Sequence, residues 1–249
     1  MKWPIGVIKK SSGIAESWVY QPNTDRTWPP NAQPPPSGGF FVLKNFVCYS
    51  DYMNNPIHPI VDFLYEVGIL ARTPRSGFHF LGSGSQSVAE HGNRSAYIGY
   101  VLASMEKDVD SAKVLKMCLF HDLSEARTSD LNYVHQKYAQ ADHGKAVTDI
   151  ANSLEFGDDI KSTIDEYEER TSKESILAKD ADNLEWIISL KEQVDIGNKR
   201  AEEWIPSAIK RLKTESAKNV AAGIMQVDSN HWWFSDKEGE WWVSRNKKK

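Results

Sequence analysis

Three stretches of the chain with helical hydrophobic periodicity each place metal-binding side chains on the face that should be buried. The first stretch contains His91, the second contains the adjacent pair His121 and Asp122, and the third contains the two aspartates of segment 180–182. Burying imidazoles and carboxylates on apolar faces is costly unless a cation or hydrogen bonds compensate for the lost water. Two imidazoles together with carboxylates suit a divalent ion of intermediate softness. The sequence therefore predicts a core in which three separate helices hold one metal ion.

The helical periodicity extends from about residue 56 to residue 223, and no convincing run of strands interrupts it. Ser87 and Thr171 are each followed three residues later by glutamate, which is the capping-box pattern that opens a helix. The sequence predicts an all-α bundle, with further helices at 111 to about 126, 158–169 and 202–222. The helix after Ser87 should bury one apolar stripe, formed by Ile98, Val101, Leu102 and Met105.

The two ends of the chain differ in character from this helical part. Residues 1–52 include seven of the eleven prolines, and segment 21–39 is too rich in proline to form a helix, so an extended or disordered arm is expected. One alternative explanation is that Met53, at the start of the expected domain at 53–223, is the natural start and that the arm is an upstream extension. Within 224–249, the Trp-rich segments 231–234 and 240–243 flank a four-residue turn, which predicts a C-terminal β-hairpin followed by a basic tail.

Composition excludes several classes of protein. The formal net charge is −4, whereas binders of extended nucleic acid carry a basic surplus, so a small anionic substrate is favoured. The two cysteines form no CxxC pair, which suits a reducing cytoplasm. No apolar run is long enough for a signal peptide or a membrane span, so we expect a cytoplasmic protein without membrane contact.

Five short strings occur along the chain in an order that resembles a known family. They are Pro-Arg-Ser-Gly-Phe at 74–78, Ser-Val-Ala-Glu-His at 87–91, His-Asp-Leu-Ser-Glu at 121–125, Asp-Leu at 130–131 and Ala-Lys-Asp-Ala-Asp at 178–182. This pattern is similar to that of the HD superfamily of metal-dependent phosphohydrolases, in particular its 5′-deoxynucleotidase branch. The resemblance covers roughly residues 56–200. It implies an HD-domain helical bundle, a homodimer, and hydrolysis of (deoxy)nucleoside 5′-monophosphates by a metal-activated water.

The resemblance also implies roles for particular residues. One divalent ion (Mn, Co, Zn, Fe or Mg) would be held by His91, His121, Asp122 and Asp182, with Asp180 left as a solvated or supporting group. The catalytic carboxylates would be Glu125 and Asp130, and which of them moves the proton stays open. The substrate would be bound by Arg75 at the phosphate and by Lys137 near the pocket. The family commonly has tryptophan near this arginine, where the chain has Phe78, so preference for deoxyribose over ribose also stays open.

Three alternatives remain at this point. A triphosphohydrolase, or a phosphatase acting on another small phosphate ester, would use the same chemistry. A dinuclear HD oxygenase would need further histidines between His121 and Asp182, where His135 and His143 are available. A non-catalytic nucleotide sensor would not need the acidic residues Glu125 and Asp130.

Overall fold

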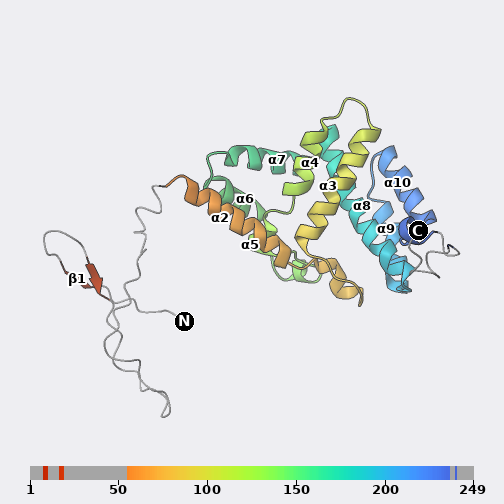
Figure 1. Ribbon diagram of the computed structural model, residues 1–249, viewed down its shortest axis with the longest axis horizontal. Helices are drawn as coiled ribbons and strands as arrows, with labels where there is room; N and C mark the ends of the chain where they lie inside the picture. The colour runs from red at the N-terminus through yellow and green to blue at the C-terminus, as the bar shows by residue number, and fades with distance from the viewer. Residues whose placement is uncertain (1–7, 11–16, 20–54, 236–238, 240–249) are drawn as a thin grey trace, which may run out of the picture. The chain divides into compact units, whose positions relative to one another are not determined.

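The computed structural model describes residues 8–10, 17–19, 55–235 and 239 (Figure 1). The chain divides into two units, Met1–Val47 and Cys48–Lys249. In the first unit, β1 (Ile8–Lys10) pairs antiparallel with β2 (Ser17–Val19), and Lys9 lies opposite Trp18. This short pairing was not expected from the sequence. The Pro-rich segment 21–39 and the predicted boundary at residue 52 lie outside the described residues.

The described part of the second unit is built from helices, which confirms the predicted all-α class. The α-helices are α2 (Ile57–Val67), α3 (Val88–Met105), α4 (Ser111–Phe120), α5 (Glu125–Thr128), α6 (His143–Ala151), α7 (Gly157–Glu169), α8 (Lys173–Asp195), α9 (Lys199–Ile209), α10 (Glu215–Gln226) and α11 (His231–Phe234). Three short 3₁₀ helices connect them, namely η1 (Gly68–Arg72), η2 (Ser76–Phe80) and η3 (His135–Lys137). None of the described helices is both long enough and apolar enough to cross a membrane.

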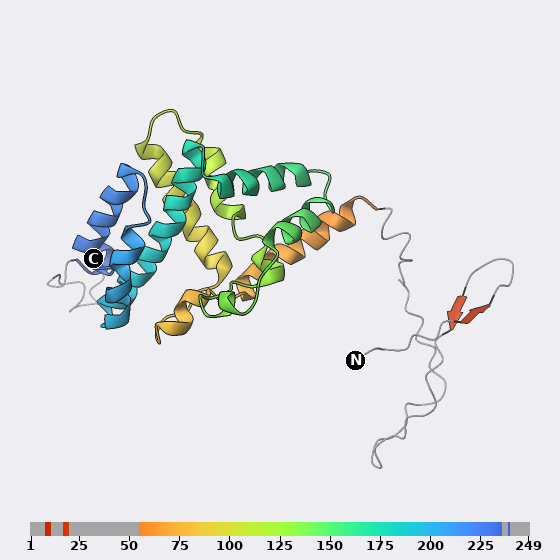
Figure 2. The same ribbon diagram turned by 180° about the vertical axis from the view of Figure 1, so that it is seen from behind.

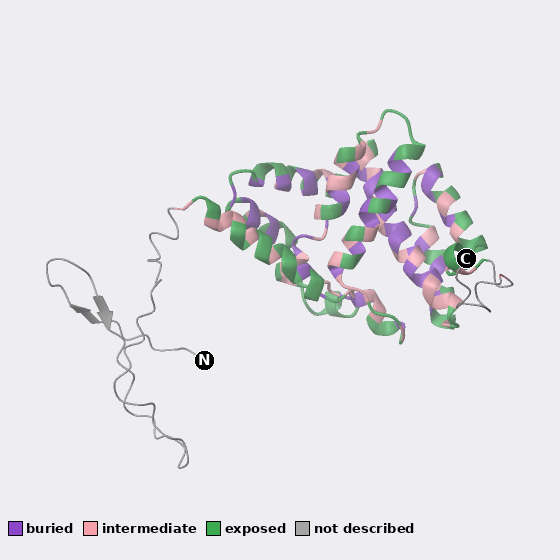
Figure 3. Ribbon diagram, viewed as in Figure 1, coloured by how far each residue is buried: buried purple, intermediate pink, exposed green. Residues whose placement is uncertain are grey.

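Helix α8 is the centre of the domain. Helices α3 and α4 pack along it, α9 and α10 cover another side, and α7 joins it at its N-terminal half (Figures 1 and 2). Its residues Leu184, Ile187 and Leu190 are completely buried in the larger of two apolar clusters. The smaller cluster contains Val147 and Ile150 of α6. Figure 3 shows buried positions on α3 and α8 and also on the helices around them, so polar side chains at these positions must find partners inside the protein.

Helix α3 begins as predicted but buries a slightly different face. Ser87 accepts a hydrogen bond from the backbone N–H of Glu90, and the Glu90 carboxylate accepts from the Ser87 N–H, so the capping box is confirmed. Ile98 and Leu102 are buried, whereas Val101 and Met105 are about half exposed, so those two assignments were wrong. The face that packs on α8 is spaced by alternating steps of three and four residues, and it includes Ser95 as well as Ile98 and Leu102.

Three predicted helix limits were also wrong. Helix α8 is capped by Ser172, not Thr171, because the Ser172 side chain accepts from the backbone N–H of Ser175. The helix predicted at 111–126 ends at Phe120, and the helix predicted at 202–222 is broken between Ile209 and Glu215.

A buried carboxylate holds this second break in place. The Asp180 oxygens accept hydrogen bonds from the backbone N–H groups of Lys213 and Thr214 and from the Thr214 hydroxyl. Asp180 is therefore a buried structural group in the turn before α10, not a solvated one.

The C-terminal hairpin prediction is contradicted in its first half. Segment His231–Phe234 forms the short helix α11. Local hydrogen bonds explain the difference, because the Asn230 side chain accepts from Trp233 Nε1 and the Asp228 carbonyl accepts from the His231 N–H. The predicted second strand at 240–243 lies outside the described residues.

Candidate metal centre

His91 is fixed at the start of α3, where the capping box stabilises the first turn. The imidazole is completely buried between α3 and α8. Its Nδ1 atom lies 2.6 Å from Oε2 of Glu185 on α8. This contact leaves the other ring nitrogen, Nε2, directed at His121 and Asp182.

His121 and Asp122 lie in the turn that follows α4, rather than on a continuous helix. Nδ1 of His121 lies 2.9 Å from the carbonyl oxygen of Cys118, which is the geometry of an N–H donor on that nitrogen. Cys118 is buried, as expected for a small core residue, and a Cβ atom at Gly99 would lie 2.7 Å from its sulfur. Only glycine at position 99 therefore lets α3 and α4 approach closely enough to bring His91 and His121 together.

Asp182 enters the same place from α8. Its Oδ2 atom accepts hydrogen bonds from Lys179 Nζ at 2.7 Å and from the hydroxyl of buried Tyr167 at 3.1 Å. Its other oxygen, Oδ1, lies 3.1 Å from His91 Nε2. Tyr167 and Lys179 thus hold one carboxylate oxygen while the second one faces the imidazoles.

The free ligand atoms of these residues converge on one point. The two Nε2 atoms of His91 and His121 lie 3.3 Å apart, and ligand atoms of His91, His121 and Asp182 all lie within 4.8 Å of one another. Oδ2 of Asp122 lies 3.2 Å from Nε2 of His121 and 3.6 Å from Nε2 of His91. Because the Nδ1 atom of each ring faces an acceptor, the Nε2 atoms are left to bind a cation, and a divalent cation fits this donor set.

The charges of the two aspartates are stabilised within the site. Burial would raise the pKa of Asp122, but the charges of His121 and Arg75 hold it below its ordinary value. Burial acts in the same direction on Asp182, where Lys179 and the hydrogen bond with His91 lower the pKa. Both groups are therefore carboxylates at neutral pH, as metal ligation requires.

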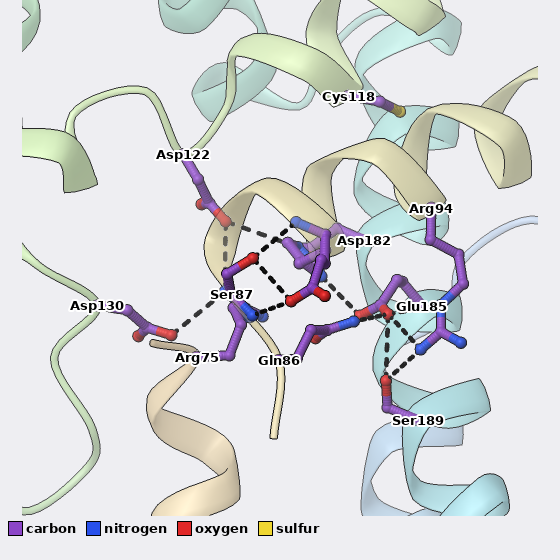
Figure 4. A network of polar contacts seen from close by, with 12 residues as sticks. Arg75, Gln86, Ser87, Arg94, Cys118, Asp122, Asp130, Asp182, Glu185 and Ser189 are labelled. Carbon is purple, nitrogen blue, oxygen red and sulfur yellow. Dashed lines mark hydrogen bonds and ion pairs between the residues drawn. The ribbon is translucent and has the colours of Figure 1, made fainter. Parts of the chain in front are cut away.

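Glu185 was not singled out from the sequence, yet it is the most enclosed carboxylate of the site. Its Oε1 atom accepts hydrogen bonds from Gln86 Nε2 at 2.6 Å, Arg94 Nε at 2.8 Å and the Ser189 hydroxyl at 3.1 Å (Figure 4). Burial would raise the pKa of Glu185, but the hydrogen bond with His91 and the charges of His91 and Arg94 lower it to about 2. Its place three residues after Asp182 on the same helix was a signal that could have been used.

Arg75 is brought to the site by a short pairing of two loops. Its backbone N–H donates to the carbonyl of Gln86, and Pro74 and Ser87 form an isolated β-bridge. Its Nη1 atom lies 3.3 Å from Asp122 and 3.4 Å from Asp130 (Figure 4). Burial would lower the pKa of the guanidinium, but Asp122 and the neighbouring acids raise it, so Arg75 stays charged.

The two candidate catalytic carboxylates have different surroundings. Asp130 accepts hydrogen bonds from both the backbone N–H and the hydroxyl of Ser76, each at 2.9 Å, and so ties down the loop that carries Arg75. Oε2 of Glu125 is buried and has no hydrogen-bond partner among the described residues. Burial raises the pKa of Glu125 to about 9, and the negative charges of Asp122 and Asp130 add to the effect.

A cavity of about 1250 Å³ opens in front of the cluster. Its lining includes Arg75, Asp122, Asp130 and Asp182, together with Lys179, Arg170, Arg211, Lys213, Trp186 and Trp204. Phe78 and Lys137 are not among the lining residues. Phe78 packs edge-on against Trp186, and Lys137 lies exposed on η3.

The histidines that a second metal would require lie apart from the cluster. Nδ1 of His143 lies 3.0 Å from the Ser124 hydroxyl, and the ring of His135 lies 6.4 Å from that of His79. Within the part of the chain that the structure describes, neither joins His91, His121 and Asp182 in a group of possible ligands.

The sequence of residues 67–224 matches the HD-domain family, and the chain belongs to this family. Among curated relatives, 5′-deoxynucleotidase HDDC2 of Danio rerio is 28% identical over 184 residues, covering 66% of this chain and 91% of that protein. The human 5′-deoxynucleotidase HDDC2 is 24% identical over 203 residues, covering 74% of this chain and 98% of that protein.

Solved structures show the same fold. A conserved hypothetical protein from Pyrococcus furiosus superposes with a TM-score of 0.59 at 30% identity, covering 67% of this chain and 99% of that chain. A predicted metal-dependent phosphohydrolase from Magnetospirillum magnetotacticum superposes with a TM-score of 0.56 at 18% identity. The match covers 72% of this chain and 94% of that chain. The predicted HD-domain fold is thereby confirmed, and the curated relatives support the assignment of this chain as a hydrolase.

Proposed function

We propose that this chain is a metal-dependent phosphohydrolase that releases phosphate from deoxynucleoside 5′-monophosphates. The observation that carries the proposal is the convergence of His91, His121, Asp122 and Asp182, where Asp122 and Asp182 line one cavity together with Arg75. The curated relatives named 5′-deoxynucleotidase support the substrate class. A nucleoside monophosphate is small enough for the cavity, and its dianionic phosphate suits the cationic side chains of the lining.

One divalent ion would be bound by these two imidazoles and two carboxylates. Manganese and cobalt are the first candidates because a mixed nitrogen and oxygen donor set suits them, and Zn²⁺, Fe²⁺ and Mg²⁺ are the others. A bound ion would supply a Lewis acid for the phosphoryl group and lower the pKa of the attacking water.

The remaining steps fall to side chains of this chain. Arg75 binds phosphate oxygens through its planar fork and offsets their charge. Asp130 holds the Arg75 loop through Ser76, so we assign it a positioning role. Glu125 is left to move the proton to the 5′-oxygen of the leaving nucleoside, because its raised pKa keeps it protonated at neutral pH.

The two other predicted substrate residues receive more distant roles. Phe78 would act through Trp186, against which it packs, and not by touching the sugar. Lys137 would meet the substrate only if η3 shifted toward the cavity. Both assignments stay predictions.

The structure supports the three alternative functions to different degrees. A dinuclear oxygenase is disfavoured because His135 and His143 contact other groups. A non-catalytic sensor gives no reason for a buried Glu125 oxygen that lacks a hydrogen-bond partner among the described residues. A triphosphohydrolase is the nearest competitor, because Arg170, Arg211 and Lys213 could bind further phosphates.

Phosphate release from a panel of nucleotides tests the proposal. Purified protein loaded with Mn²⁺, Co²⁺ or Mg²⁺ should hydrolyse deoxynucleoside monophosphates faster than ribonucleoside monophosphates and triphosphates. Triphosphate release from a deoxynucleoside triphosphate as the main activity would overturn it in favour of the competitor. Metal analysis of the same sample should give one ion per chain.

The family resemblance also leads us to propose a homodimer in a reducing cytoplasm. Helix α2 has no buried residue, and its apolar side chains Ile57, Leu64 and Tyr65 are exposed. A second copy of the chain would cover this face. Light scattering after size-exclusion chromatography should give the mass of a dimer for the native protein and of a monomer for Leu64→Glu.

A further inference from the structure

Two indole rings form a continuous aromatic surface in the cavity that contains the metal cluster. Trp186 of α8 and Trp204 of α9 both line it, with their ring centroids 6.4 Å apart and their planes 40° apart. Both side chains are only partly buried, although the core is close beneath them. We call this surface the tryptophan wall.

The position of Trp186 relative to the metal ligands is fixed by its helix. Trp186 follows Asp182 by one turn of α8 and so lies on the same face, about 6 Å further along the axis. Arg75, Asp182 and Trp186 line one cavity, so a molecule whose phosphate lies beside Arg75 and the metal ligands can reach the wall.

The indole is also held firmly from behind. A Cβ atom at Gly77 would lie 2.7 Å from Cη2 of Trp186, so only glycine allows this ring to lie against the backbone beside Arg75. Phe78 packs edge-on against the same ring, with centroids 5.5 Å apart and an interplanar angle of 86°. A ring that is held by these contacts and also lines the cavity is suited to stacking.

We propose that the tryptophan wall is the site that binds the nucleobase of the substrate, with Trp186 as the main stacking residue. The inference rests on the proposed function and extends it from the phosphate to the base. The sugar of a nucleoside monophosphate holds the base apart from the phosphate, just as one turn of α8 holds Trp186 apart from Asp182. Every base has a π-face, so stacking accepts purines and pyrimidines alike.

The proposed stacking of the base on Trp186 is tested by comparing two substrates that differ in the presence of the base. Deoxyadenosine 5′-monophosphate and deoxyribose 5-phosphate share the phosphate and the sugar, so the ratio of their kcat/KM values isolates the base. Trp186→Leu should lower this ratio at least about tenfold, mainly through KM of the nucleotide, and Trp186→Phe should restore most of it. The matched control is Trp232→Leu, because Trp232 is 83% exposed on α11, and it should leave the ratio unchanged.

A binding measurement gives a second readout. Deoxyadenosine 5′-monophosphate should quench the tryptophan fluorescence of the native protein and of Trp232→Leu, but much less that of Trp186→Leu, and deoxyribose 5-phosphate should quench none of them. If circular dichroism shows that Trp186→Leu does not fold, Trp204→Leu carries the test, because it removes the other ring of the tryptophan wall and should also lower the ratio.

Three results would overturn the inference or its basis separately. Equal losses on both substrates would show that Trp186 only supports the fold of the site. No change of the ratio in Trp186→Leu and Trp204→Leu would show that the base lies elsewhere. Absence of phosphate release from both substrates with the native protein would contradict the proposed function itself, while the quenching would still report on base binding.

Discussion

Oε2 of Glu185 lies 2.6 Å from Nδ1 of His91, and both side chains are completely buried. A carboxylate in this position accepts the Nδ1 proton and leaves Nε2 free for a metal. The carboxylate is in turn held by Arg94, which also pairs with Glu192 at the surface. The tautomer of His91 is therefore set by a side chain that is not itself a metal ligand.

Weakening this pair should weaken metal binding. Glu185→Gln keeps the shape but removes the charge, and we expect metal affinity to fall about 10- to 100-fold. Competition with a chromophoric chelator measures the metal affinity of each variant. Glu192→Gln is the matched control, since it removes the charge of the other acidic partner of Arg94 without touching His91. Equal affinities for the native protein and Glu185→Gln would show that His91 is oriented by packing alone.

Replacing Arg75 should impair substrate turnover more than stability. Arg75→Ala should lower kcat/KM about 100-fold or more because the phosphate loses its fork, and Arg75→Lys should rescue only part of that loss. Steady-state kinetics and thermal melting of each variant measure the two effects. Arg72→Ala is the control, because it removes an arginine that is exposed. A lowered melting temperature with unchanged kinetics would mean that Arg75 only neutralises Asp122 and Asp130.

Mutations should distinguish the metal ligand Asp122 from the proton donor Glu125. Asp122→Ala should lose metal and activity together, whereas Glu125→Gln should keep the metal and turn over at least about 100-fold more slowly. Metal analysis and rates on both variants measure this. Loss of metal from Glu125→Gln would make Glu125 a ligand or its support, and full activity would move the proton to Asp130 or bulk water.

Metal affinity should rise with pH. Burial and Arg75 would lower the pKa of His91, but its hydrogen bonds to Asp182 and Glu185 raise it to about 9 in the metal-free protein. A raised pKa stabilises the metal-free fold fully below about 6.5, the ordinary value for histidine, and this contribution is lost as pH rises through about 9. The metal competes with the proton for Nε2, so it binds more tightly over the same window.

The pH effect is measured by thermal melting with and without Mn²⁺ from pH 6 to pH 9. The gap between the two melting temperatures should widen as pH rises, because the metal-free protein loses stability while the metal gains affinity. A gap that stays constant over this window would show that His91 is already unprotonated at pH 6.

Local sequence signals predicted the helical parts of the site well. The Ser87 capping box placed His91 in the first turn of α3, because a cap depends only on neighbouring residues. The order of His91, His121–Asp122 and Asp182 resembled that of a family to which the chain does belong. These signals depend on spacing of a few residues, and such spacing can be read along the chain.

Only the tertiary structure decided which side chains meet across helices. The end of α4 at Phe120 depends on the turn that aims His121 and Asp122 at α3 and α8, and periodicity alone predicted a longer helix. Glu185 and Trp186 follow Asp182 within one turn of α8, yet one is buried against Arg94 while the other lines the cavity. Helical spacing fixes on which face a residue lies, but the burial and partners of that face come from helices distant in sequence. The sequence by itself therefore determined the fold class and the order of the candidate ligands, and packing around α8 decided how the site is held.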